Sequence, residues 1–295
     1  MKKYAILAIA FVGLLILPGS VYCQQWQDLV EQIATGDINW TKGVVQAKGI
    51  GAPPERYYGK PQARPMAVRA AKLDAMRNLL EATKGVRISS TTLVKDFAVT
   101  SDIIMSQIEG MVKGAQVVHQ EYMSDGTVEV TMQMSLMGGF AQLILPMEIK
   151  QVESIRPIPP VHKEPLPPIV KKPSAPALKP VSEVFTGMVI DSRGINARPA
   201  MAPKILNENG EEVYGSAYVS REFAVQQGMS GYAKDLTAAQ SNPRVTNSPL
   251  TVKGLRTEGH GRSDIVISNA DASKLRSASE HLTFLKKCRV MIVVD

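Results

Sequence analysis

A cluster of prolines near the middle of the chain constrains its fold more than any other feature. Nine of the 19 prolines in this 295-residue sequence fall within 24 residues: Pro157, Pro159, Pro160, Pro165, Pro167, Pro168, Pro173, Pro176 and Pro180. Proline has no backbone N–H and favours extended polyproline II. We therefore expect a linker over residues 151–182, between folded domains at 24–150 and 183–295. At about 3.1 Å per residue the linker could reach about 70 Å, so a semi-rigid strut and a solvated connector both stay open.

The first 23 residues have the order of charges and apolar residues that is typical of a secretory signal peptide. Lys2 and Lys3 precede an apolar run of 14 residues, Tyr4 to Leu17, which Pro18 and Gly19 interrupt. That run is shorter than the ~20 residues of a membrane-spanning helix. We expect Sec export, followed by residence in the periplasm or at the outer membrane.

Cys23 leaves two processing routes open. Ordinary cleavage after Cys23, with Val21 as the other small residue, would release Gln24 as the new N-terminus. Lipidation of Cys23 would require a small residue before it, where this chain has the bulky Tyr22. We favour the ordinary route. The other cysteine, Cys288, lies in an apolar stretch and is interpreted as a small buried hydrophobe rather than a reactive thiol.

The composition is that of a globular protein with an aliphatic core. Apolar residues make up 44% of the chain, charged residues 21% and aromatic residues 5%. The net charge of +7 falls to +5 once Lys2 and Lys3 are removed. A basic balance favours nucleic acid or an anionic surface as partner, and export argues against nucleic acid.

The apolar spacing in residues 24–150 predicts helices packed on one face of an antiparallel sheet. Trp26, Leu29, Val30 and Ile33 share a helical face that Gly36 would end. Further along we expect a strand within 40–50, a loop over 51–65, helices over 66–83 and from 101 or 102, and a hairpin of 116–123 with 128–136. The core face expected for the helix over 66–83 consists of Met66, Ala70, Leu73, Met76 and Leu80.

Residues 183–295 predict a smaller mixed α/β domain. The expected strands are 184–190, 250–255, 265–267 and 288–294, the last of them interior to a sheet. A helix is expected over 270–282. Residues 220–240 should form short helices broken by Gly228 and Gly231, and Asn209-Gly210 should form a turn.

The search for catalytic chemistry predicts no catalytic, cofactor-binding or metal-binding residues. The four histidines lack the spacing of zinc ligands, and neither a phosphate loop nor a nucleophile elbow occurs. Three candidate interaction loops remain. Asp191 and Arg193, with Arg198 nearby, follow a predicted strand and suit either a site or an ion pair that holds a loop. His260 lies between two glycines. Arg56, Tyr57 and Tyr58 could form an exposed patch for a partner or glycan, or anchor their loop by packing.

Residues 64–81 carry a resemblance to known envelope proteins. Their centre reads Ala71-x-x-Asp74-Ala75-x-x-Asn78-Leu79-Leu80-Glu81, and Gly85-Val86, Ser101-Asp102, Gly110 and Gly114 follow. Residues 37–145 resemble the LPP-twenty-type lipoprotein domain and the N-terminal domain of flagellar assembly protein T. The resemblance implies an α+β envelope domain without known catalytic residues, in surface or outer-membrane lipoproteins or in the periplasmic ring around the flagellar basal body. Residues 183–295 do not match the later domains of the flagellar protein.

These observations support three hypotheses. The first is a non-enzymatic scaffold or adaptor for envelope or basal-body proteins, with self-association as an option. The second is a periplasmic module that binds an anionic polysaccharide, peptidoglycan or a lipid headgroup. The third is an enzyme built around the loops of Asp191, Arg193 and His260.

Overall fold

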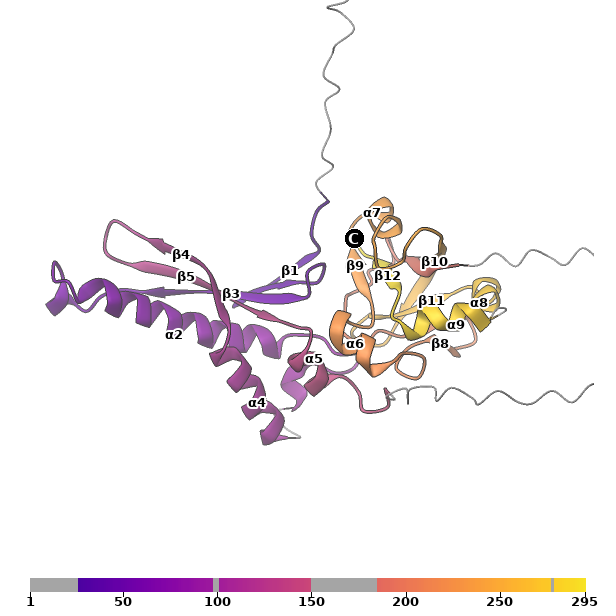
Figure 1. Ribbon diagram of the computed structural model, residues 1–295, viewed down its shortest axis with the longest axis horizontal. Coiled ribbons are helices and arrows are strands. Elements are labelled where there is room, and N and C mark those ends of the chain that lie inside the picture. Colours follow the sequence, from indigo (N-terminus) through magenta and orange to yellow (C-terminus); the bar gives the residue numbers. More distant parts are fainter. Residues whose placement is uncertain (1–25, 98–100, 150–184, 277–278) are drawn as a thin grey trace, which may run out of the picture.

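The computed structural model describes residues 26–97, 101–149, 185–276 and 279–295 and contains two β-sheets (Figure 1). An antiparallel five-stranded sheet lies in the N-terminal part, and a mixed seven-stranded sheet lies in the C-terminal part. This is the α+β and mixed α/β architecture that the sequence predicts. The expected signal peptide, Cys23 and the proline-rich linker lie outside the described residues. No described helix is both long and apolar enough to cross a membrane.

The N-terminal sheet has the strand order β1-β2-β3-β5-β4. Its strands are β1 Val30–Ile33, β2 Gly36–Asn39, β3 Val44–Gly51, β4 Gln116–Tyr122 and β5 Val128–Ser135. The helices of this part are α2 Ala63–Lys84, α4 Asp102–Lys113 and α5 Gly139–Ile144, with 3-10 turns η1 Glu55–Tyr57 and η2 Val94–Asp96. The predicted hairpin of β4 and β5 is confirmed, and so is the Ser101 cap of α4, whose hydroxyl accepts from the Ile104 amide.

The helix expected over residues 26–33 is wrong. Residues 30–33 form β1, which pairs antiparallel with β2 through a tight turn. Four apolar residues spaced over eight positions fit a helical face, but Trp26 and Val30 remain 41% and 39% exposed. As a strand, this segment forms its backbone hydrogen bonds with the neighbouring strand. A short helix without a core to pack against would be less stable.

The buried face of α2 consists mainly of alanines, which corrects part of the expected face: Met76 and Leu80 pack partly buried against the core, but Met66, Ala70 and Leu73 do not. Ala67, Ala71, Ala75, Leu79 and Ala82 are fully buried, whereas Leu73 is 54% exposed and Met66 37% exposed.

Glycines of β3 make this close packing possible. A Cβ atom on Gly49 would lie 2.0 Å from the Ala75 nitrogen, and one on Gly51 would lie 2.3 Å from the Ala67 oxygen. The helix therefore lies against the strand backbone itself, where only glycine fits beneath it and only small side chains fit above.

The C-terminal sheet has the order β8-β7-β11-β10-β6-β12-β9. Its strands are β6 Gly187–Asp191, β7 Ile205–Leu206, β8 Glu212–Tyr214, β9 Gly231–Ala233, β10 Pro249–Glu258, β11 Asp264–Ile267 and β12 Val290–Val293. Its helices are α6 Arg221–Gln227, α7 Leu236–Gln240, α8 Asn269–Arg276 and α9 Ser279–Lys286. Strands β10, β6, β12 and β9 are parallel neighbours, so β12 is interior as predicted.

Three local expectations for this part need correction. The single helix predicted over 270–282 is two helices, α8 and α9. Gly231 does not break a helix but begins β9. Cys288 precedes β12 in a turn with φ 53° rather than lying within the strand. For Gly231, the short strand β9 pairs with β12 and extends the parallel sheet, a long-range gain that local periodicity does not report.

The two parts pack directly against each other. One cluster of mutually contacting buried apolar residues runs through both. Arg221 of α6 donates to the carbonyls of Gln142 and Pro146, and the Gly138 amide donates to the Val225 carbonyl. The hairpin of β4 and β5 and the start of α2 project away from the C-terminal part as an arm (Figure 1).

The close packing of α2 on β3 makes a testable prediction. Replacing Ala71 by Leu forces a larger side chain against strand backbone and should lower the free energy of unfolding by about 3 kcal/mol. Replacing the exposed neighbour Ala70 by Leu should change it by less than about 0.5 kcal/mol. Urea unfolding of both variants measures the difference. Equal stabilities would contradict the packing described here.

Candidate interaction surface

Asp191 and Arg193 form a structural ion pair at the carboxyl end of β6. The Arg193 Nε and one Nη donate to the two Asp191 carboxylate oxygens at 2.8 and 2.9 Å. The Lys253 Nζ lies 3.8 Å from the same carboxylate. The hydrogen bond from Arg193 lowers the pKa of Asp191. Both partners are satisfied locally, so the geometry matches the loop-holding alternative.

His260 lies far from that ion pair. Lys253 of β10 is paired in register with Asp191, and His260 follows seven residues later, about 20 Å further along the strand direction. Its loop instead contacts the N-terminal part, where the Gly261 amide donates to the Ser90 carbonyl at 2.7 Å and the Ser90 hydroxyl donates to Asp264. The structure thus does not bring Asp191, Arg193 and His260 into one site.

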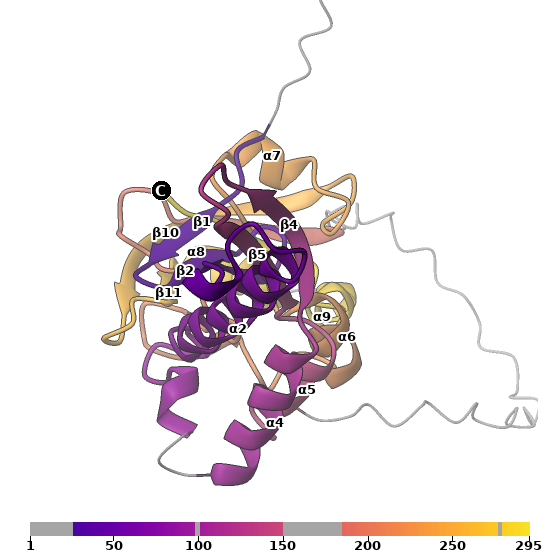
Figure 2. The same cartoon turned by 90° about the vertical axis from the view of Figure 1, so that its left-hand side faces the viewer.

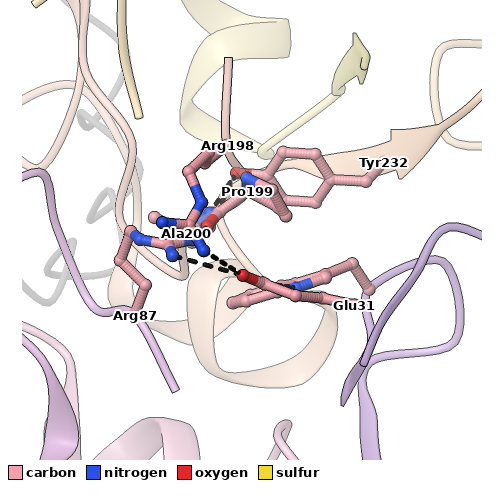
Figure 3. Close-up of polar contacts among 7 residues, drawn as sticks. Glu31, Arg87, Arg198, Pro199, Ala200 and Tyr232 are labelled. Carbon is pink, nitrogen blue, oxygen red and sulfur yellow. Dashed lines mark hydrogen bonds and ion pairs between the residues drawn. The ribbon is translucent and has the colours of Figure 1, made fainter. Parts of the chain in front are cut away.

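Arg198 belongs to a half-buried polar junction between the two parts, which we call the Glu31 junction (Figure 3). One Glu31 oxygen lies 2.5 Å from an Arg198 Nη and 3.3 Å from an Arg87 Nη. The other accepts from the Trp40 indole N–H at 2.9 Å. Arg87 also donates to the Pro199 carbonyl at 2.6 Å. A carboxylate of β1 is therefore held by guanidinium groups from both parts of the chain.

Backbone and aromatic contacts surround this junction. The amides of Met201 and Ala202 donate to the carbonyls of Arg87 and Ile88, so the backbone at residues 87–88 pairs across the interface. The Tyr232 hydroxyl bonds both the amide and the carbonyl of Ala200, and the Tyr232 ring meets Trp40 edge-on at 5.8 Å. Burial raises the pKa of Tyr232 to about 12, which keeps it protonated as a donor.

The Glu31 carboxylate stays ionised despite its burial. Burial acts to raise its pKa, but the hydrogen bond from Trp40 and the charges of Arg87 and Arg198 outweigh burial and lower the pKa below its ordinary value. Removing either side of such a pair leaves an uncompensated charge in a poorly solvated place. The Glu31 junction therefore works as a charge-assisted clamp, not as a reaction site.

Of the remaining predicted loop, Arg56 to Tyr58, only Tyr57 lines an open groove on the arm. The Arg56 guanidinium lies 4.9 Å and the Lys60 ammonium 5.6 Å from the centroid of the Tyr57 ring. The groove has a volume of about 640 Å³ and is lined by Ala52, Pro54, Tyr57, Gln62, Pro65, Met66, Arg69, Ala70 and Leu73. We call it the α2 groove. Tyr58 points to a neighbouring hollow beside the tip of the hairpin.

The α2 groove exists because α2 has two apolar faces. Its alanine face packs on the sheet, and the larger Met66 and Leu73 are left on the opposite side. Arg69 belongs to the groove lining, and Arg56 and Lys60 lie over the ring of Tyr57, another lining residue. An apolar floor with a positive rim suits an amphipathic segment that carries acidic flanks.

Two polar residues of the family-like motif have a structural role that the sequence did not reveal. Strand β3 is longer than β2, so the second half of β3 has no strand partner on the β2 side. There the Asp74 carboxylate accepts from the Ile50 amide at 3.0 Å, and the Asn78 amide donates to the Lys48 carbonyl at 2.7 Å. Asp74 and Asn78 are four residues apart and so lie on one side of a helix. That spacing is the sequence signal that could have indicated their shared role.

Cys288 has the inert character that the sequence suggests. Its side chain is fully buried, and burial raises its pKa to about 11. Arg244 donates to the carbonyls of Cys288, Gln227 and Gly228, and so places a cation at the C-terminal end of α6. Within the part of the chain that the structure describes, no three His, Cys, Asp or Glu side chains are grouped to hold a metal ion.

The comparisons with known proteins concern the C-terminal part. Residues 187–295 match the family model for the second domain of Treponema pallidum Tp0624. The match covers just over a third of the chain and leaves the arm and the α2 groove outside it. No curated protein matches this chain. The resemblance of residues 37–145 to envelope lipoprotein domains stays a prediction.

The Glu31 junction predicts a specific loss of stability. Glu31→Gln should lower the free energy of unfolding at pH 7 by about 2–3 kcal/mol, because two guanidinium groups lose their anionic partner. The exposed Glu55→Gln is the matched control and should have little effect. Urea unfolding at pH 7 tests both.

The same junction predicts the sign of a pH effect. A lowered pKa means that the contribution of Glu31 is complete above its unfolded pKa of about 4.3 and is lost as the pH falls through the folded value. The difference in stability between the natural chain and Glu31→Gln should therefore shrink below about pH 4. A difference that stays constant or grows in acid would show that Glu31 is not ionised in the folded protein.

Proposed function

We propose that this protein is an exported, non-catalytic adaptor of the bacterial cell envelope, which holds another envelope protein in the α2 groove. The observation that carries the proposal is the groove itself. Met66 and Leu73 are large apolar side chains of a well-packed helix, yet they remain exposed beside a Tyr57 ring flanked by cations. Exposed apolar area of this kind, with a polar rim, is typical of protein interaction sites.

The attachment of the arm suits such a role. The Glu31 junction and the α5–α6 contacts join the base of the arm to the C-terminal part, and the groove lies on the projecting portion (Figure 1). A rigidly held arm binds without first ordering itself, which lowers the entropic cost of association. The N-terminal export pattern and the lipoprotein-like motif support an envelope location, with flagellar basal-body proteins as the first partners to test.

The charges of the groove define the chemistry of the partner. Arg56, Lys60 and Arg69 favour a segment with one apolar face and acidic residues beside it. The alternative is an anionic polysaccharide, peptidoglycan or a lipid headgroup, for which the cations around Tyr57 are the supporting observation. Neither proposal involves a cofactor or nucleic acid.

Fractionation of cells with variants of the groove tests the proposal. The tagged protein, expressed at its native level, should begin after the predicted signal peptide by mass spectrometry and co-sediment with detergent-extracted basal bodies. Leu73→Glu should reduce that co-sedimentation at least about tenfold, since it places a charge in an apolar contact. Ile103→Glu is the control, because Ile103 is 73% exposed on α4 and lies outside the groove.

Three outcomes would decide against the adaptor. Equal sedimentation of both variants would separate the groove from partner binding. Recovery in the soluble periplasmic fraction, with binding to cell-wall sacculi or anionic vesicles that falls with salt, would favour the anionic-ligand module. Retention in the cytoplasm with an intact Met1 would refute export.

A further inference from the structure

The edge strands of the two sheets differ in how well other groups cover them, and this difference indicates a second interaction surface. Within the described residues, β9 is covered by Thr41, whose hydroxyl donates to the Tyr232 carbonyl. At β8 the Tyr218 hydroxyl donates to the Glu212 carbonyl. The free half of β3 is closed by Asp74 and Asn78. Strand β1 is only four residues long and has Glu31 within the junction. Short, covered or charged edges prevent strand pairing.

Strand β4 is the exception. Its seven residues form the outer edge of the N-terminal sheet, and its only described strand partner is β5. Val117, Val118 and Tyr122 are 40%, 47% and 48% exposed. An irregularity between Val117 and His119 leaves residues 119–122 in regular pairing with β5. A long edge with unpaired backbone groups and exposed apolar side chains is suited to adding another strand.

The sequence of β4 specifies which strand would fit. Residues 119–121 read His-Gln-Glu, so two antiparallel copies centred on Gln120 are complementary to each other. In an antiparallel pair of two such strands centred on Gln120, each His119 lies opposite Glu121 of the second copy. Gln120 lies opposite itself. We propose that two copies of this chain associate through antiparallel pairing of their β4 strands in this register.

The charges of the outer face support that register. His119 and Glu121 pair with Thr131 and Glu129 of β5, so both lie on the sheet face opposite α2. Within one copy the His119 Nε2 is 3.8 Å from a Glu121 oxygen, and both side chains are more than half exposed. Directly opposed residues in antiparallel strands have Cβ atoms about 5 Å apart, close enough for each imidazole to donate to the carboxylate of the other copy. Pairing with a shift of one residue would place side chains of opposite faces against each other.

Exchanging the two charged residues tests the pairing. Sedimentation velocity at rising concentration should show a monomer–dimer equilibrium for the natural protein. Glu121→Lys should weaken it about tenfold, because each His119 loses the carboxylate acceptor of the other copy. The double variant His119→Glu/Glu121→Lys puts an anionic side chain opposite a cationic one and should restore the dimer. Glu109→Lys, an equal charge change on α4, should have no effect.

A cysteine at the symmetry axis tests the register. With Cys23 replaced by Ser, and Cys288 buried, Gln120→Cys should form an intermolecular disulfide under mild oxidation, since opposed residues approach within disulfide reach. Gln116→Cys, on the same strand but off the axis, should form much less. A monomer at every concentration, failure of the double variant to recover, or equal cross-linking at both positions would overturn the proposal.

This inference is separate from the α2 groove, whose lining includes no residue of β4. Leu73→Glu should therefore leave the dimer unchanged, and Glu121→Lys should still bind a partner through the groove. Circular dichroism of each variant shows whether it is folded. The pairing of β4 strands and the binding of a partner in the α2 groove can thus be refuted independently.

Discussion

The contact between the two parts of the molecule includes one half-buried carboxylate that links them by charge. Glu31 lies on a short edge strand and is held by Arg87 from its own part and Arg198 from the other (Figure 3). Buried charges are costly unless several partners compensate them, so such a cluster tolerates few relative positions of the two parts. The backbone bonds of Met201 and Ala202, and the contact of Trp40 with Tyr232, add to the same interface. Viewed along the arm in Figure 2, the C-terminal part lies behind its base.

Close packing at α2 determines which surface is left for function. Because β3 presents Gly49 and Gly51 to the helix, alanines are what the core accepts there. The larger apolar residues of α2 are thereby displaced to the outside, where they make the groove floor. The same helix closes the free edge of β3 through Asp74 and Asn78. The α2 groove and the blocked edge are thus two consequences of one tight helix–sheet contact.

Local patterns predicted the elements well and their partners poorly. The Asp125-Gly126 hairpin, the Ser101 cap and the helix over 66–83 depend on neighbours within a few residues, and the structure confirms them. The face of α2 was predicted only in part: Met76 and Leu80 pack against the core, but Met66 and Leu73 do not, because the glycines of β3 leave space for alanines there. The helix expected at 26–33 failed for a similar reason, since β2 and the Glu31 junction lie outside that window. Of the candidate loops, Arg198 proved structural, and only its partner Glu31, 167 positions away, explains why.

The distance between the two parts tests the central claim of a single rigid body most directly. Spin labels on Glu109→Cys in α4 and Asn209→Cys in the turn before β8, with Cys23 replaced by Ser, report that distance by double electron–electron resonance. A fixed junction predicts one narrow distance distribution, which broadens when Glu31→Gln is added. A broad distribution in the natural protein would contradict the account, because the arm and its groove would then be carried on a flexible tether.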